Sequence, residues 1–265
     1  MTPSPPPRYT LLGTVGITCP DAVPAITACK VRTVLAVLLL AGGRRVTTEQ
    51  LVDHVWPDQP PASAVKNLQL YVHRLRRALT LANRATPARN PLVRTPDGYC
   101  LLVDPASVDM LVAESLAERA EQAATLGRVD AAADLLRQAL SGWSENPVGG
   151  VTRSARLVAV TRRLQERRLA LLERQCELDL MLGRHIVAAD QLRGLVDLHP
   201  FRESLHALLI TALARSGHRA EAIGVFHQLR RRLLDELAIG PGVATRAAYQ
   251  DMLQSDRVPP PGMPA

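Results

Sequence analysis

Apolar residues recur at helical spacing between Ala62 and Leu79. Successive members of this series are three or four residues apart, which places them in one stripe of an α-helix. The stripe consists of Val65, Leu68, Val72, Leu75 and Leu79. At about 100° per residue, the opposite face is mostly polar and basic. It carries Ser63, Lys66, Asn67, Leu70, His73, Arg74 and Arg77, with Tyr71 and Arg76 on its flanks. The pattern therefore predicts an amphipathic helix with a basic back.

Two further helices are predicted before this one. Val46–Trp56 has an apolar face and opens with Thr47-x-x-Gln50, which fits a capping box. The proline-rich turn 57–61 ends it, because proline lacks the helix donor and disfavours helix in the residue before it. Val31–Leu40 predicts a more buried helix, closed by two glycines. Three helices in this order form a helix-turn-helix core whose last helix enters the DNA major groove.

Short strands are predicted on both sides of the three helices. Between Tyr9 and Lys30 the β-branched residues and glycines indicate a small sheet. Leu92–Val103 predicts a β-hairpin that turns at Asp97-Gly98, with Arg94 and Thr95 at its tip or rim. A basic helix followed by a hairpin is typical of a winged helix-turn-helix, in which the wing contacts phosphate or the minor groove.

The chain from Ser107 to Leu253 is rich in Ala and Leu and predicts helix after helix. Glycine-containing turns begin at Gly183 and Gly217, and this spacing of 34 residues is the tetratricopeptide period. A similar turn at Gly127 is off that period. We expect helix pairs whose stacking buries the core. The pairs are 107–126 with 129–142, 155–182 with 186–198, and 202–216 with 219–237, followed by a final helix at 244–253.

Charge and length agree with this picture. A chain of 265 residues is expected to form two domains. The net charge of +7 suits a polyanionic partner. Nearly all of the cations are arginine, and a GC-rich genome explains that excess equally well. The position of the cations is more informative, since one predicted helix carries Lys66, Arg74, Arg76 and Arg77. The basic runs 162–168 and 230–232 are expected to be solvated helix faces, with a partner-binding surface as the alternative for 162–168.

Motifs for catalysis, cofactors and membranes are missing from the sequence. It contains no GxxxxGK[ST], GxGxxG, GxSxG or HExxH pattern, so neither an enzyme nor a bound cofactor is expected. The four cysteines have no metal-binding spacing and are expected to be free thiols. The longest apolar run, Val34–Ala41, is too short to span a bilayer, and the proline-rich residues 1–8 are not expected to act as a signal peptide. A cytoplasmic, nucleoid-associated protein is expected.

The chain resembles the SARP family (Streptomyces antibiotic regulatory proteins) over roughly residues 9 to 253. The likeness lies in the run from Lys30 through Leu40, in TTEQLVDHVWPDQPPASA, in LQLYVHRLRRAL and in the Gly-Tyr of the hairpin. It implies an OmpR-type winged helix followed by a bacterial transcriptional activator domain. The expected fold is thus mainly α with a small β component, an N-terminal winged helix-turn-helix before a tetratricopeptide-like helical array. Expected boundaries are a disordered tail (1–8), the DNA-binding domain (9–104), the activator domain (107–253) and a second disordered tail (254–265).

The resemblance implies that the basic helix is the DNA-recognition helix, so candidate contacts can be assigned to its residues. Candidate base or near-base contacts are Lys66, Asn67, Leu70, Tyr71, His73 and Arg74. Candidate phosphate contacts, which set affinity but not sequence, are Arg44, Arg45, Arg76, Arg77 and Arg94, with Thr95 beside them in the wing. For Leu70 two interpretations stand: it meets thymine methyls, or it packs on another element of the domain. Two departures from the family pattern matter. The order Arg94-Thr95 is reversed, so a re-aimed wing contact is expected, and Tyr71 with His73 replace the more common His and Ser, so base preference does not transfer from relatives.

The predicted function is a sequence-specific transcriptional activator. By resemblance, two copies bind direct repeats in promoter DNA and recruit RNA polymerase holoenzyme through the Trp56–Pro61 loop and the helical domain. The family also implies control of a secondary-metabolite (antibiotic) gene cluster. Two alternatives remain: a tetratricopeptide adaptor whose winged helix docks protein, and a repressor with the same DNA contacts.

Overall fold

The structure is a computed structural model that describes residues 7–19, 26–82 and 90–254. Contacts divide the chain into two compact units, one of residues 1–119 with 135–169 and the other of residues 120–134 with 170–265. The tails predicted at 1–8 and 254–265 lie almost wholly outside the described residues. Arg8 and Gln254, which are described, belong to the first strand and the last helix.

The first unit begins with a two-stranded antiparallel sheet, as predicted. Strand β1 (Arg8–Thr10) pairs with β2 (Gly16–Thr18), and Tyr9 lies opposite Ile17. The connection between the strands contains Leu11 and Leu12, both fully buried. Their backbone N–H groups donate to the carboxylate of Asp109 at 2.8 and 3.0 Å. Burial raises the pKa of Asp109, although these backbone donors favour its charged form.

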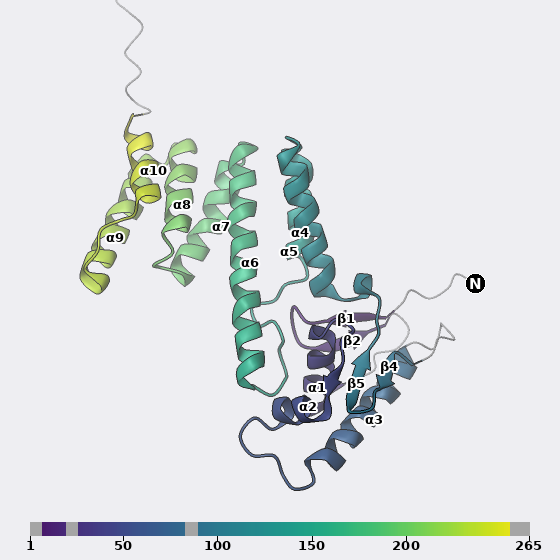
Figure 1. The fold of residues 1–265 in the computed structure, drawn as a ribbon. Coiled ribbons are helices and arrows are strands. Elements are labelled where there is room, and N and C mark those ends of the chain that lie inside the picture. Colours follow the sequence, from purple (N-terminus) through teal and green to yellow (C-terminus); the bar gives the residue numbers. More distant parts are fainter. Residues whose placement is uncertain (1–6, 20–25, 83–89, 255–265) are drawn as a thin grey trace, which may run out of the picture. The chain divides into compact units, whose positions relative to one another are not determined.

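Three helices form the centre of the first unit (Figure 1): α1 (Cys29–Leu40), α2 (Thr48–Val55) and α3 (Ala64–Ala82). Eight of the twelve residues of α1 are buried, which agrees with its near-continuous apolar sequence. The predicted capping box is present, since Thr47 Oγ1 accepts from Gln50 N–H at 3.2 Å and Gln50 Oε1 accepts from Thr47 N–H at 3.0 Å. Each pair among the three helices is in contact.

A three-stranded sheet completes the winged helix, with strand order β3-β5-β4. Its strands are β3 (Val46–Thr47), β4 (Leu92–Arg94) and β5 (Gly98–Leu101), all antiparallel. The helix predicted from Val46 therefore begins two residues later, because Val46 and Thr47 pair with β5. The hairpin prediction is right in place but wrong in its turn. Gly98 opens β5 instead of occupying the turn, which lies at Pro96-Asp97.

Close approach between strands accounts for the glycine at position 98. A Cβ atom there would lie 2.7 Å from the Cα atom of Thr47, and closer still to the carbonyl oxygen of Val46. Real Cβ atoms do not come so near to backbone, so any side chain at this position would push β3 away from β5. Gly98, which the sequence pattern assigned to a turn, is therefore required by the close packing of β5 against β3.

The helices that follow match the predicted pairs to within about three residues. A 3₁₀ turn (Pro105–Ser107) leads into α4 (Asp109–Thr125), α5 (Val129–Leu140) and α6 (Ala155–Met181), which carry residues of both units. The second unit continues with α7 (His185–Leu198), α8 (Glu203–Arg215), α9 (Arg219–Leu237) and α10 (Val243–Gln254). Helix α8 contacts α7, α9 and α10, as Figure 1 shows.

The predicted glycine turns end their helices in the left-handed conformation. Gly127, Gly183 and Gly217 have φ values of 72°, 73° and 82°. At each one, the N–H of the next residue donates to a carbonyl five residues earlier, as from Arg184 to Asp179 at 2.8 Å. This hydrogen bond satisfies a carbonyl that the helix end would leave unpaired. Among the described residues, no helix is both long enough and apolar enough to cross a membrane.

Candidate nucleic-acid interface

Helix α3 presents its apolar stripe to the interior of the winged helix. Its buried residues are Ala64, Leu68, Val72, Leu75 and Leu79. The prediction that Val65 belongs to the stripe is wrong, since this side chain is 52% exposed. Ala64 and Val65 flank the stripe on opposite sides, 100° apart, and at the first turn of α3 the interior lies on the side of Ala64.

The outward face of α3 is basic with one apolar residue at its centre. Lys66, His73, Arg74 and Arg77 are exposed. Leu70 is 45% exposed, so it is not buried against another described element of the domain. This observation favours the interpretation that Leu70 meets an external surface. Asn67 is half-buried, and its side-chain amide donates to Ser63 Oγ at 3.1 Å.

No carboxylate neutralises this face in the described structure. Lys66, Arg74 and Arg77 form no ion pair with any residue that the structure describes. The sequence explains why. The segment from Gln59 to Pro96 contains seven lysines and arginines and not one aspartate or glutamate. Cations held apart from intramolecular partners produce a positive potential that an external polyanion can neutralise.

The exposed amide of Gln69 completes this surface, and the prediction missed it. Gln69 lies about 100° from Leu68, at the edge of the apolar stripe, so helical periodicity alone gives it no place on the polar face. An amide can pair with the N6 and N7 atoms of adenine, which makes Gln69 a further candidate for base recognition. Only the residue type, an amide side chain that can pair with adenine, could have indicated Gln69 from the sequence.

Tyr71 and Arg76 support α3 from its flanks. The ring of Tyr71 stacks on Trp56 with centroids 5.9 Å apart, and the Lys30 ammonium lies 4.6 Å from the Trp56 ring. These contacts join α3 to the end of α2 and the start of α1. The half-buried Arg76 donates from Nη2 to the carbonyl oxygen of Leu92 at 3.3 Å, which ties α3 to β4. Both side chains therefore have structural partners that the sequence did not reveal.

The hairpin turn is attached to the start of α2. Arg45 Nη1 lies 3.0 Å from Asp97 Oδ1, and the backbone N–H of Thr48 donates to the Asp97 carbonyl at 2.9 Å. Arg94, the last residue of β4, is exposed. Thr95 is half-buried, and its hydroxyl has no hydrogen-bond partner among the described residues. Among the residues that the structure describes, Arg94 is thus an exposed wing cation that forms no ion pair.

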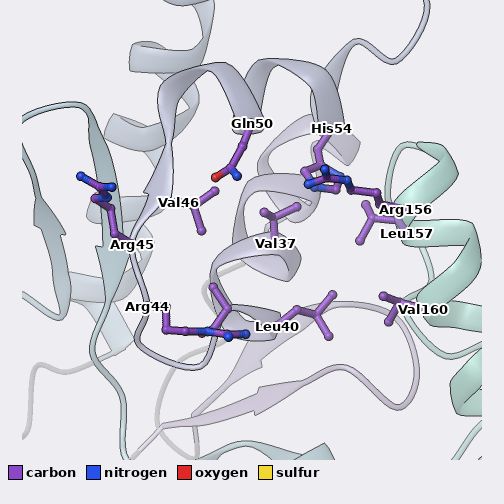
Figure 2. Close-up of a pocket in the computed structure, with 11 residues that line it drawn as sticks. Val37, Leu40, Arg44, Arg45, Val46, Gln50, His54, Arg156, Leu157 and Val160 are labelled. Carbon is purple, nitrogen blue, oxygen red and sulfur yellow. The ribbon is translucent and has the colours of Figure 1, made fainter.

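The adjacent residues Arg44 and Arg45 point in different directions (Figure 2). Arg45 extends toward the hairpin, where it meets Asp97. Arg44 extends along the end of α1 toward Leu40, and its Nε donates to the carbonyl oxygen of Ala41 at 3.0 Å. The two arginines, which the sequence treats alike, therefore have different surroundings.

Family models match both halves of the chain. The model "Transcriptional regulatory protein, C terminal" matches residues 27–100, and the model "Bacterial transcriptional activator domain" matches residues 108–253. The first match runs from α1 to all but the last residue of β5 and contains the whole outward face of α3. The second contains every helix from α4 to α9 and most of α10.

Known regulators resemble the chain over most of its length. It is 37% identical over 232 residues to the regulatory protein DnrI of Streptomyces peucetius, covering 86% of this chain and 85% of that one. It is 36% identical to the regulatory protein AfsR of Streptomyces coelicolor, covering 94% of this chain but only 24% of AfsR.

A solved structure supports the fold. The structure of Mycobacterium tuberculosis EmbR in complex with a low-affinity phosphopeptide superimposes with a TM-score of 0.83 at 26% identity, over 94% of this chain and 65% of EmbR. None of these three relatives is named as an enzyme. The matched models and relatives establish that the chain belongs to the SARP family, DNA-binding regulators of transcription with an OmpR-type winged helix and a bacterial transcriptional activator domain.

Proposed function

We propose that the protein activates transcription by inserting α3 into the major groove of promoter DNA. The observation that carries this proposal is the exposed basic face of α3, which has no carboxylate partner among the described residues. A B-DNA major groove admits one α-helix, and its phosphates supply the negative charge that this face lacks. Membership of a family of DNA-binding regulators supports the same conclusion.

Sequence recognition is assigned to the centre of the outward face. Arg74 and Lys66 suit the O6 and N7 acceptors of guanine, and Leu70 suits the methyl group of thymine. His73 lies between them as a further donor or acceptor. Asn67 and Tyr71, which are half-buried, border this group and contact bases only at its edge.

Backbone contacts are assigned to the cations around this centre: Arg77 on α3, Arg94 in the wing and Arg45 at the hairpin turn. Phosphate contacts fix the register of a protein on DNA without reading sequence. Arg76 holds α3 against β4 through the Leu92 carbonyl, so we assign it a positioning role. Thr95 shares that wing and lies next to Arg94.

The family resemblance extends the proposal to assembly and output. Two copies bind direct repeats, and the loop after Trp56 together with the helical array contacts RNA polymerase holoenzyme. In support, residues 57–61 of that loop are exposed, while Trp56 at its base contacts both Lys30 and Tyr71. The regulated genes are those of a secondary-metabolite cluster.

Footprinting and transcription test the proposal together. Purified protein is added to its own upstream DNA and to neighbouring promoters, and protection is mapped at single-nucleotide resolution. The proposal predicts two protected repeats on one face of the duplex and more transcript from that promoter with purified holoenzyme. Protection of a repeat with reduced transcript would indicate a repressor. No protected sequence at all would favour the adaptor function.

A further inference from the structure

A cavity of about 410 Å³ lies within the first unit, away from the outward face of α3 (Figure 2). Its walls come from the end of α1, the segment that joins α1 to β3, helix α2 and the first turns of α6. Small-molecule sites occupy about 300–1,000 Å³, so its size suits a compact organic ligand. Neither the matched family models nor the DNA-binding proposal gives it a role.

The lining of the cavity is apolar on one side. Val37 and Leu40 of α1, Val46 of β3, and Leu157 and Val160 of α6 form this part. Val37, Val46 and Leu157 belong to the buried core, whereas Leu40 and Val160 are half-buried. A ligand that fills this space needs an apolar body, because water gains few hydrogen bonds from such walls.

The polar part of the lining is cationic. Arg44 and Arg156 are cationic lining residues, whereas the guanidinium of Arg45, which also borders the cavity, extends away toward the hairpin; no aspartate or glutamate lines the cavity. Arg45 is paired with Asp97, but Arg44 and Arg156 form no ion pair with any described residue. In Figure 2 the side chain of Arg156 lies beside His54. A guanidinium without a carboxylate partner suits a bidentate carboxylate ligand.

Neutral polar groups accompany these cations. His54 is buried, and its Nδ1 lies 2.8 Å from Ser154 Oγ, which fixes the ring. Burial lowers the pKa of His54, and the charge of Arg156 lowers it further, so the imidazole favours its neutral form. Gln50 adds a carboxamide to the same wall. Hydrogen-bonding groups above an apolar floor match an amphipathic molecule better than an inorganic ion.

We propose that this cavity binds a small amphipathic organic anion, with its apolar body against α1 and α6 and its carboxylate at Arg44 and Arg156. The cations exclude a metal ion, and the apolar lining disfavours free phosphate. Because the walls belong to α1, α2 and α6, such a ligand contacts both the helix-turn-helix and the first turns of α6, which lie inside the region matched by the activator-domain model.

The test uses 2-naphthoate and its neutral analogue 2-naphthamide, titrated into the full chain with labelled Leu and Val methyl groups. Methyl NMR spectra report both affinity and position. The proposal predicts selective shifts of Leu157 and Val160, with no shift of the exposed Leu234 and Val243 in the second unit. Naphthoate is expected to bind about tenfold or more tightly than naphthamide, since a charge-assisted hydrogen bond contributes at least that much.

Variants separate a site from general attraction. Arg156→Gln is expected to remove the preference for naphthoate over naphthamide. Val160→Phe is expected to block both probes, because the larger side chain occupies part of the cavity. Arg163→Gln is the matched control, because Arg163 is exposed on the same helix and does not line the cavity. The same spectra show whether each variant is folded.

Three results would overturn the proposal: no methyl shift up to the solubility limit of the probes, equal affinity for the acid and the amide, or an equal effect of Arg156→Gln and Arg163→Gln. The assay contains no DNA, so its outcome is independent of the proposed DNA contacts.

Discussion

The arginines of α3 and those of the helical array differ in their surroundings. In the array, many arginine side chains form ion pairs with carboxylates. Arg174 lies 2.9 Å from Glu121 and 2.8 Å from Glu177, and Arg193 lies 2.8 Å from Glu221. Hydrogen bonds to these carboxylates raise the pKa of Arg174 and of Arg193. Arg74 and Arg77 of α3 have no such partner among the described residues.

This difference shows that the number of cations in a region does not indicate whether they are available to an external anion. The array is rich in arginine, but many of these arginines have carboxylate partners within the array. Some pairs lie within one helix, and others connect segments, as Arg202 Nε does with Glu173 Oε1 of α6 at 2.7 Å. One arginine of the basic run 162–168 also has a carboxylate partner, since Arg167 Nη2 lies 2.8 Å from Glu114 Oε2. On α3, Lys66, Arg74 and Arg77 form no ion pair with any described residue. Their cost in mutual repulsion is offset only when an external anion binds.

Charge reversal on α3 is expected to have the largest effect on DNA affinity. Arg74→Glu should weaken specific DNA binding about a thousandfold, or ~4 kcal/mol, because it removes a base contact and adds repulsion from phosphate. Mobility-shift titration on the footprinted promoter measures this loss. Arg163→Glu, an equal charge change on an exposed position of α6, is the control. Equal losses in the two variants would contradict a localised interface.

Leu68 and Leu70 of α3 test the contrast between its buried and outward faces. Leu68→Ala should lower the free energy of unfolding by about 3 kcal/mol, because it leaves a cavity at a fully buried position. Leu70→Ala should change it by less than about 0.5 kcal/mol, yet should reduce discrimination at one base pair of the operator. Urea unfolding measures the first quantity and competition with mutated operators the second. A strongly destabilised Leu70→Ala would show that this residue packs inside the domain after all.

A phosphate contact should have a smaller and less selective effect. Arg77→Gln is expected to weaken specific and scrambled DNA alike, about threefold to tenfold at moderate salt, and to reduce the slope of log affinity against log salt by about one. Binding isotherms at several salt concentrations give that slope. If only the specific site were weakened and the slope unchanged, Arg77 would be a base contact.

Ion pairs in the array should give the smallest effect. A double-mutant cycle on Arg193 and Glu221 is expected to yield a coupling of about 0.2–1 kcal/mol in the free energy of unfolding, because both side chains are partly exposed to solvent. DNA affinity should not change. A measurable loss of DNA binding would show that the array's charges contribute to the interface.

Secondary structure was accessible from sequence because each signal was local. Periodicity, the Thr47 capping box and the helix-ending glycines at 183 and 217 all act within a few residues, and all are present in the structure. The turn at Gly98 was misassigned because its cause is not local. The neighbour that demands glycine there is β3, about fifty residues earlier in the chain.

The candidate site was predictable in its outline and not in its contacts. Spacing placed Lys66, Arg74 and Arg77 on one exposed face. It gave no sign that Tyr71 stacks on Trp56, that Arg76 binds the Leu92 carbonyl, or that Arg44 and Arg45 diverge. These features depend on tertiary neighbours from other elements, which helical periodicity does not specify.

The most direct test of the central claim is the ratio of affinities for the footprinted promoter and for scrambled DNA of the same length, measured at physiological salt. If the outward face of α3 reads base edges, the promoter should bind about a thousandfold or more tightly than scrambled DNA. Equal affinities that collapse together as salt rises would mean that the protein only attracts phosphate, and would contradict sequence recognition by α3.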